Sequence, residues 1–209
     1  MRGDFDKQLD LHKKLCLQVK ASRPYFFYIS TANVFDQDMS VAHTESDAPS
    51  AASEYGKFKM ACEDLVNDHL DHVAIVRLPM VFGQSCRRVK ELVESASKEE
   101  ALPIFPGLKL NITTNEMIAD KINHMVATRP TGIFHFGTTD RVHHASLYKE
   151  LVDKLNIEEV NLVEETDLVG DFSLISERLD VFPADLQVTT DQVVAQLVEM
   201  NRESHGRNS

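Results

Sequence analysis

The stretch from residue 25 to residue 59 constrains the fold of this chain more than any other part of the sequence. It begins with an apolar run, Tyr25–Ile29, which ends at the hydroxyl pair Ser30-Thr31. A run without a polar face is typical of a parallel-sheet strand that is buried on both sides. After a polar loop over 37–53, the pattern predicts a helix over 54–70 and a second buried strand over 73–78. This order predicts a parallel crossover unit and therefore an α/β fold.

Tyr55 and Lys59 stand four residues apart at the start of the predicted helix, so their side chains are expected on one face. A free tyrosine has a pKa near ~10, which is too high for ready proton exchange at neutral pH. A neighbouring ammonium lowers that pKa because it favours the phenolate. If Thr31 polarises a carbonyl oxygen that Tyr55 protonates, the site reduces a ketone or, in reverse, oxidises an alcohol. A Tyr-x-x-x-Lys spacing alone arises by chance, so the prediction depends on the whole ordered set.

Three segments in this order resemble the extended short-chain dehydrogenase/reductases. They are Tyr28–Asp36, Thr44–Pro49 and Tyr55–Lys59, and the match continues through Arg77–Gly83. Within that family the sequence most resembles the dTDP-4-dehydrorhamnose reductase group and its relatives, which include the regulatory beta subunit of methionine adenosyltransferase. The resemblance extends over residues 5–200 and is most specific from 28 to 83. It implies an α/β fold made of the C-terminal part of a Rossmann-type parallel sheet domain plus a small substrate-covering lobe.

The resemblance also implies a role for each matching residue. Thr31 would orient the substrate carbonyl, Tyr55 would be the general acid, and Lys59 would lower the pKa of Tyr55 and hold the nicotinamide ribose. The implied cofactor is NADP or NAD, and the residues expected to contact it are Ser30, Tyr55, Lys59, Pro79, Met80 and Val81. The residues expected to contact a nucleotide-sugar substrate are Ala32, Asn33, Arg87 and Arg88. The reductases usually carry an acid and an aromatic where this chain has Ala32 and Asn33, so the resemblance does not identify the substrate.

A dinucleotide site of this kind also needs a glycine-rich turn, whose bare backbone admits the pyrophosphate at a helix N-terminus. None of the 8 glycines forms that pattern, so we expect only the nicotinamide-side residues to be present. The 209-residue chain is therefore expected to bind NADP or NAD with a Kd weaker than about 1 mM. The strand over 25–29 would also lack a neighbour in the sheet. Its apolar edge is expected to form a homodimer or to be covered by a partner chain.

Charge and cysteine content exclude several kinds of partner and location. The formal charge of −11 argues against a nucleic acid or an anionic membrane as partner. No apolar run approaches the ~18 residues of a membrane span, and the first residues are not typical of a signal peptide. Cys16, Cys62 and Cys86 form no C-x-x-C pair, which is typical of reduced thiols and favours a cytoplasmic protein.

Hydrophobic periodicity predicts the other elements. An amphipathic helix is expected from Phe5 to Val19, ending at Arg23-Pro24. Capping-box spacings at Thr113–Glu116 and Thr189–Gln192 predict where two later helices begin. The remaining elements are expected at these positions: helices at 89–96 and 147–155, and strands within 102–112 and at 132–136.

The pattern divides the chain into three parts. Residues 1–83 are expected to form a partial Rossmann-type NAD(P)-binding domain, residues 84–200 a substrate-binding lobe with returning sheet elements, and residues 201–209 a frayed tail. Within the lobe, the segments expected to cover the substrate are 104–115, 134–138 and 171–179.

Three functional hypotheses follow. The first is NAD(P)-dependent reduction of a keto group on a nucleotide-linked sugar. The second is a non-catalytic regulatory or interaction subunit on the same scaffold, and the third is a nucleotide-sugar epimerase or dehydratase, which shares the Tyr-Lys pair. The intact Thr-Tyr-Lys set favours the first, and the absent glycine turn favours the second. No metal site is expected, because His143 and His144 are adjacent and point in different directions, and the His69/His72 pair has no third ligand nearby. Arg87-Arg88 have a solvated helix start as their alternative interpretation.

Overall fold

The structure is a computed structural model that describes residues 4–83, 86–98 and 100–206. Its central element is a three-stranded parallel sheet with the strand order β1-β2-β7. β1 (Phe26–Thr31) pairs with β2 (Val73–Leu78), and β2 pairs with β7 (Gly132–His135). The predicted α/β class and the parallel crossover between the first two strands are therefore confirmed.

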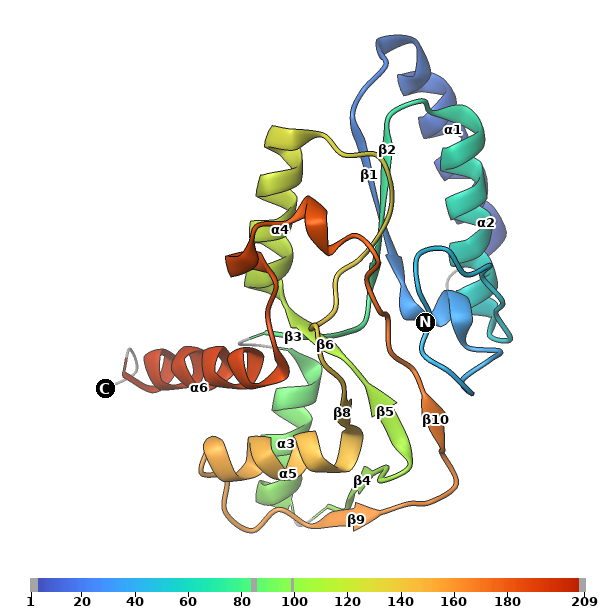
Figure 1. Ribbon diagram of the computed structural model, residues 1–209. Coiled ribbons are helices and arrows are strands. Elements are labelled where there is room, and N and C mark those ends of the chain that lie inside the picture. Colours follow the sequence, from blue (N-terminus) through green and yellow to red (C-terminus); the bar gives the residue numbers. More distant parts are fainter. Residues whose placement is uncertain (1–3, 84–85, 99, 207–209) are drawn as a thin grey trace.

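Helices cover both faces of this sheet in the upper half of the molecule (Figure 1). α1 (Phe5–Val19) and α2 (Glu54–His69) lie on one face, where Cys16, Cys62 and Val66 pack on Tyr28 and Ile75. α4 (Asn115–Thr128) lies on the other face, where its side chains join a cluster of phenylalanines from β7 and the segment after it. Burial of these apolar faces, rather than helix propensity, holds short helices of this kind in place.

The lower half is a lobe built from short strands and helices (Figure 1). β5 (Leu108–Leu110) pairs with β8 (Val142–His143) and β10 (Gly170–Asp171). The other elements of the lobe are β3 (Met80–Phe82) with β6 (Ile112–Thr114), β4 (Leu102–Ile104) with β9 (Leu162–Glu164), and the helices α3 (Arg87–Lys98), α5 (His144–Lys154) and α6 (Thr190–Gly206). Thirteen buried side chains of these elements form one apolar core.

The structure corrects one of the two predicted helix starts. Thr114, not Thr113, caps α4, because its hydroxyl accepts the Met117 backbone N–H at 3.1 Å. Thr113 is held in β6 opposite Val81, so its backbone belongs to a strand pair and the capping box predicted there is wrong. The second box is confirmed: the Thr189 N–H donates to Gln192 Oε1 at 2.8 Å, and the Gln192 N–H donates to Thr189 Oγ1 at 3.5 Å.

The frayed tail predicted over 201–209 overlaps the end of the last helix and stays a prediction. α6 continues as a helix to Gly206, and residues 207–209 lie outside the described part. Val193, Val194 and Leu197 anchor α6 in the core of the lobe. Once such a helix has formed, each further residue adds a hydrogen bond at little extra cost, so the helix extends past its buried part.

β1 ends the described sheet on one side, and its position changes how the strand is buried. It pairs only with β2 among the described strands. Tyr28 and Ser30 are buried, whereas Ile29 is 39% exposed. The prediction that this apolar strand is buried on both sides is therefore wrong at Ile29, because burial depends on the neighbouring strand and not on the run itself.

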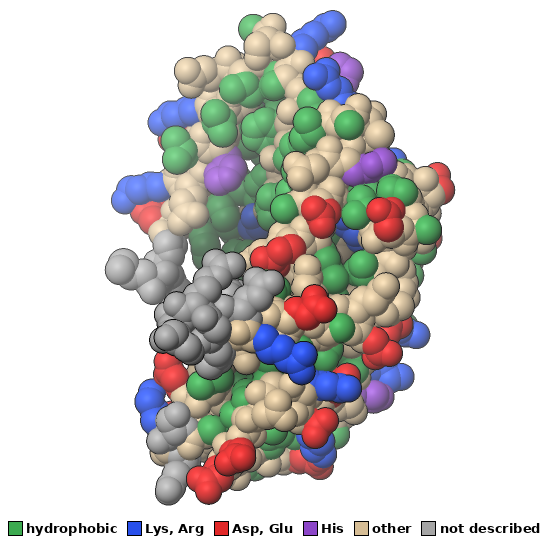
Figure 2. Space-filling view, turned by 90° about the vertical axis from the view of Figure 1, so that its left-hand side faces the viewer, with side chains coloured by type: hydrophobic (Ala, Val, Ile, Leu, Met, Phe, Trp, Pro, Cys, Tyr) green, Lys and Arg blue, Asp and Glu red, His purple; other side chains and the backbone are tan. Residues whose placement is uncertain are grey.

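Two features of the surface bear on partners. None of the helices in the described ranges is long and apolar enough to cross a membrane. On the face shown in Figure 2, the basic side chains lie among acidic ones. That distribution agrees with the acidic formal charge of the chain and provides no broad basic surface on this face.

Candidate functional site

A cleft of about 440 Å³ lies at the carboxyl ends of β1 and β2, where they meet the lobe. In open α/β sheets this end of the strands is where ligands bind. Every predicted site residue except Arg87 lines it: Ser30, Thr31, Ala32, Asn33, Tyr55, Lys59, Pro79, Met80, Val81 and Arg88. The structure thus brings the predicted residues together, and the role of each remains a prediction.

Arg87 is the exception, because its side chain lies outside the cleft. Its Nε donates to Glu91 Oε1 at 2.5 Å, one turn further along α3, and the arginine side chain is 88% exposed. Such a pair is a solvated surface contact of small energetic value. Arg88 lines the cleft instead and donates to the Val81 carbonyl at 3.3 Å. Successive helical residues point about 100° apart, so only one of the two arginines can face the cleft.

The first turn of α2 is tied to the loop before it, and this holds Tyr55 at the cleft. Ser53 caps the helix by accepting the Gly56 N–H at 3.0 Å, and its hydroxyl donates to the Asp36 carboxylate. Asp36 also accepts the backbone N–H groups of Ala52 at 2.6 Å and Ser53 at 3.1 Å. Although burial works against it, this set of hydrogen bonds holds the pKa of Asp36 below its usual range.

Gly56 lets α2 approach the end of β1 closely. A Cβ at this position would come within 2.3 Å of the Asn33 carbonyl oxygen and within 2.7 Å of the Ala51 Cβ. Real Cβ atoms do not approach a backbone oxygen so closely, so the contact requires glycine. Because Tyr55 precedes Gly56, this contact brings the start of α2 close to Asn33, two residues after Thr31.

The Lys59 ammonium is fixed at the same end of β1. Its Nζ donates to the Ile29 carbonyl at 2.6 Å and lies 4.4 Å from the centroid of the Tyr28 ring. Burial lowers the pKa of Lys59, and the neighbouring Cys62 and Glu63 act in the opposite sense. An ammonium carries three N–H donors, so the lysine can serve a ligand in the cleft while it keeps its carbonyl contact.

The two hydroxyls at the end of β1, of Ser30 and Thr31, lie in different surroundings. The Thr31 hydroxyl donates to Asn33 Oδ1 at 3.0 Å, and it accepts the Asn33 N–H at 3.3 Å. Ser30 is 3% exposed and lines the cleft, and its Oγ has no hydrogen-bond partner among the described residues. A buried hydroxyl without a partner costs free energy, and because this oxygen is closed off from solvent it does not itself face a ligand in the cleft.

The lobe adds an apolar wall to the cleft, for which the sequence predicted segments but no individual residues. Leu108, Leu110 and Phe172 line the cleft opposite β1. The first two lie in the expected segment 104–115 and the third in 171–179, whereas 134–138 supplies none of the lining side chains found among the described residues. The apolar–polar–apolar alternation of Leu108-Lys109-Leu110 is the sequence signal for the two leucines.

Across the described residues, no three histidine, cysteine, aspartate or glutamate side chains gather as a metal ion would need. The polar side chains that line the cleft include the Tyr55 phenol, the Lys59 ammonium, the Thr31 hydroxyl, the Asn33 amide and the Arg88 guanidinium. A parallel sheet with helices on both faces and a cleft at the carboxyl ends of its strands places the protein in the class of Rossmann-type α/β proteins.

The sequence matches the family model described as RmlD substrate binding domain over residues 11–169. The chain belongs to this family. It is also similar to the methionine adenosyltransferase 2 subunit beta of Danio rerio, with 25% identity over 171 residues, which cover 76% of this chain and 52% of the relative. The chain thus spans about half the length of that curated relative.

Solved structures show the same fold. A dTDP-4-dehydrorhamnose reductase from Clostridium acetobutylicum superposes with a TM-score of 0.82 at 19% identity, covering 94% of this chain and 75% of the other. One from Bacillus anthracis, solved in complex with NADP, gives a TM-score of 0.77 at 19% identity, covering 93% and 76%. The architecture is therefore that of the Rossmann-type sugar-nucleotide reductases, and the predicted fold class is confirmed.

Proposed function

We propose that the cleft binds the nicotinamide end of NADP or NAD beside a nucleotide-linked sugar and reduces a keto group of that sugar. The observation that carries this proposal is the convergence of Thr31, Tyr55 and Lys59 on one cleft. The NADP complex of the Bacillus anthracis reductase supports the choice of cofactor. Regulatory and catalytic members of such a family share a fold, so the proposal depends on the site.

The residues present fit the nicotinamide end of such a cofactor. The cleft volume of about 440 Å³ is ample for a nicotinamide ring with a sugar beside it. Lys59 lines the cleft and retains N–H donors beyond its contact with the Ile29 carbonyl. Pro79, Met80 and Val81 add apolar side chains to the same lining.

The chemistry follows from which protons these residues can hold. A bound dihydronicotinamide supplies the hydride that a carbonyl carbon accepts. Tyr55 donates its phenol proton to the carbonyl oxygen, so that an alcohol is formed, and later recovers a proton from water. Lys59 favours the resulting phenolate through its positive charge. Thr31 orients the carbonyl once its hydroxyl turns from Asn33 to the substrate.

The existing hydrogen bond of Thr31 to Asn33 opposes that last step. It favours a second candidate function, a non-catalytic subunit that binds a partner protein. The Thr31 hydroxyl already donates to Asn33 Oδ1, at a position where the reductases usually carry an aromatic side chain. A curated relative bears the name of a methionine adenosyltransferase subunit. If the bond to Asn33 persists, Thr31 cannot orient a substrate and the cleft only binds.

The experiment measures hydride transfer to dTDP-4-dehydrorhamnose by the full chain. Reduced nicotinamide mononucleotide serves as donor beside NADPH, because it needs no glycine-rich turn. Tyr55→Phe should lower the rate by about 10²–10⁴-fold, the usual value of general acid catalysis. Tyr25→Phe is the matched control, because the Tyr25 hydroxyl donates to Pro130 at 2.7 Å, away from the cleft.

The outcomes separate the two candidates. Loss of the rate in Tyr55→Phe alone, with an unchanged Tyr25→Phe, supports the reductase. A Tyr55→Phe rate within about threefold of the parent removes Tyr55 as the acid. If neither NADPH nor reduced nicotinamide mononucleotide transfers a hydride, the proposed reductase function is overturned and the non-catalytic binding subunit is favoured.

A further inference from the structure

Tyr28 of β1 lies directly beside the ammonium of Lys59. The Nζ is 4.4 Å from the ring centroid, well within the ~6 Å over which an aromatic face attracts a cation. Tyr28 is 5% exposed. Its hydroxyl lies beside the Cys62 thiol and makes no hydrogen bond of normal geometry with any described residue. The face of the ring, rather than the hydroxyl, is therefore the part of Tyr28 that serves the lysine.

We propose that Tyr28 is a positioning residue, which holds the Lys59 ammonium at the cleft through the face of its ring. This inference rests on the proposed function, in which Lys59 acts on Tyr55. The Ile29 carbonyl, at 2.6 Å, and the ring face together fix the Nζ from two directions. A lysine side chain is long and flexible, so one hydrogen bond alone leaves its ammonium free to swing toward water.

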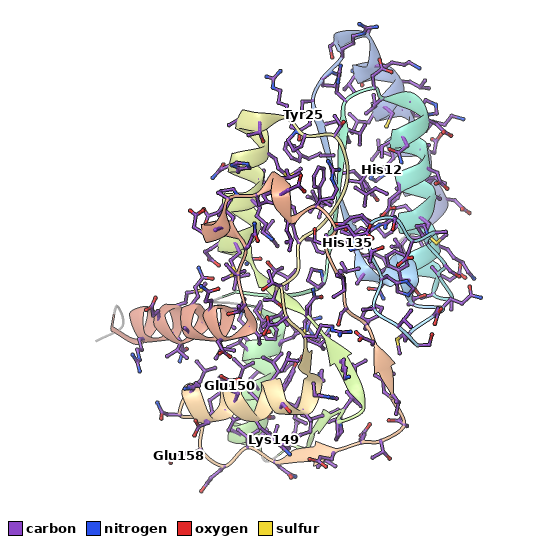
Figure 3. The ribbon with its side chains drawn as sticks, in the orientation of Figure 1. His12, Tyr25, His135, Lys149, Glu150 and Glu158 are labelled. Carbon is purple, nitrogen blue, oxygen red and sulfur yellow. The ribbon has the colours of Figure 1, made fainter. Side chains whose placement is uncertain are left out.

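The groups around Lys59 determine in which direction its pKa changes when the Tyr28 ring is altered. Cys62 and Glu63 face it from α2, and Glu63 is paired with the buried Arg77 at 2.7 Å. From α1, His12, labelled in Figure 3, makes a T-shaped contact with the Tyr28 ring, with 6.0 Å between ring centroids. Burial already disfavours the ammonium, and the negative face of the ring opposes that penalty. Weakening the attraction between the ring face and the ammonium should therefore lower the pKa of Lys59.

The test replaces Tyr28 in the full chain by phenylalanine and then by phenylalanines with one and three fluorines on the ring. Fluorine draws electron density from the ring face while nearly keeping its shape, so the core stays packed. The pKa of Lys59 is followed by NMR of its side-chain amine, and the signal is assigned by its loss in Lys59→Arg. Tyr28→Phe should leave that pKa within a few tenths of a unit, and three fluorines should lower it by about one unit.

A stepwise fall of this pKa with fluorine content supports the positioning role. An unchanged pKa across the series shows that the Ile29 carbonyl alone holds the ammonium and overturns the proposal. Circular dichroism and thermal unfolding check that each variant keeps the parent fold. The titration uses neither cofactor nor substrate, so it remains decisive even if the chain transfers no hydride.

Discussion

At the scale of single residues, a buried cluster of charged and polar side chains surrounds Arg77 of β2. The buried Arg77 donates to both carboxylate oxygens of Glu63, from Nε at 3.1 Å and from NH2 at 2.7 Å. His135, labelled in Figure 3, accepts from Arg77 at 3.5 Å and donates from Nδ1 to the Ile175 carbonyl at 3.0 Å. Both ring nitrogens are thus engaged in the neutral form. Burial, with Arg77 acting in the same sense and Glu45 against it, lowers the pKa of His135 to about 4.

This lowered pKa predicts acid sensitivity. In the unfolded chain His135 takes up a proton near its ordinary pKa of 6.5, whereas in the folded chain it does so near 4. The stability that it contributes is complete above about pH 6.5 and is lost as the pH falls toward 4. The free energy of unfolding should fall there by up to about 1.4 kcal/mol per pH unit for this proton.

The measurement is urea unfolding of the parent and of His135→Gln at pH 8, 6 and 4.5. Glutamine is uncharged at every pH, so the variant should show a smaller decline with acid even if it is less stable at pH 8. Equal declines in both proteins would contradict the assignment. His144, whose pKa burial also lowers to about 4, stays in both proteins and contributes equally.

At the scale of elements, the close approach of α2 to the turn after β1 determines the shape of the site. Asp36 and Ser53 hold the first turn of the helix, and Gly56 removes the side chain that would separate it from Asn33. Tyr55 is 44% exposed, so the site depends on where this helix begins rather than on burial of the phenol.

We expect Gly56→Ala to destabilise the protein by about 1–3 kcal/mol, the usual range for overpacking. Alanine favours a helix by about 1 kcal/mol over glycine, so an exposed site would show the opposite sign. Lys57→Ala, at an exposed neighbouring position of α2, is the control and should change stability by less than about 0.5 kcal/mol. Thermal unfolding gives both values. A Gly56→Ala protein as stable as its parent would show that α2 can shift, and that its contact with Asn33 is not required.

At the scale of the whole molecule, a sheet with helices on both faces meets a lobe of short strand pairs, and the cleft lies where they join (Figure 1). The wall from the sheet is polar at Ser30 and Thr31, and the wall from the lobe is apolar at Leu110 and Phe172. β1, which supplies the polar wall, also ends the described sheet.

An end strand with an exposed apolar residue is a site for pairing between chains. We therefore expect the full chain to form dimers or larger species at tens of micromolar concentration, and we expect Ile29→Lys to restore the monomer. Val126→Lys replaces a residue of α4 that is 54% exposed, away from the edge, and should leave association unchanged. Light scattering after gel filtration measures this. A parent that is a monomer at every concentration would show that copies of this chain do not pair along β1.

Local patterns in the sequence determined the parallel unit of β1, α2 and β2 and the common face of Tyr55 and Lys59, because strand and helix periodicities act within a few residues of one another. Only the tertiary structure decided which arginine of the pair at 87 and 88 reaches the cleft, since that depends on how α3 packs in the lobe. It also placed Tyr28 beside Lys59 and the lobe residue Phe172 opposite β1. These contacts join residues between about thirty and more than a hundred positions apart, and packing of the whole chain, not local propensity, brings such residues together.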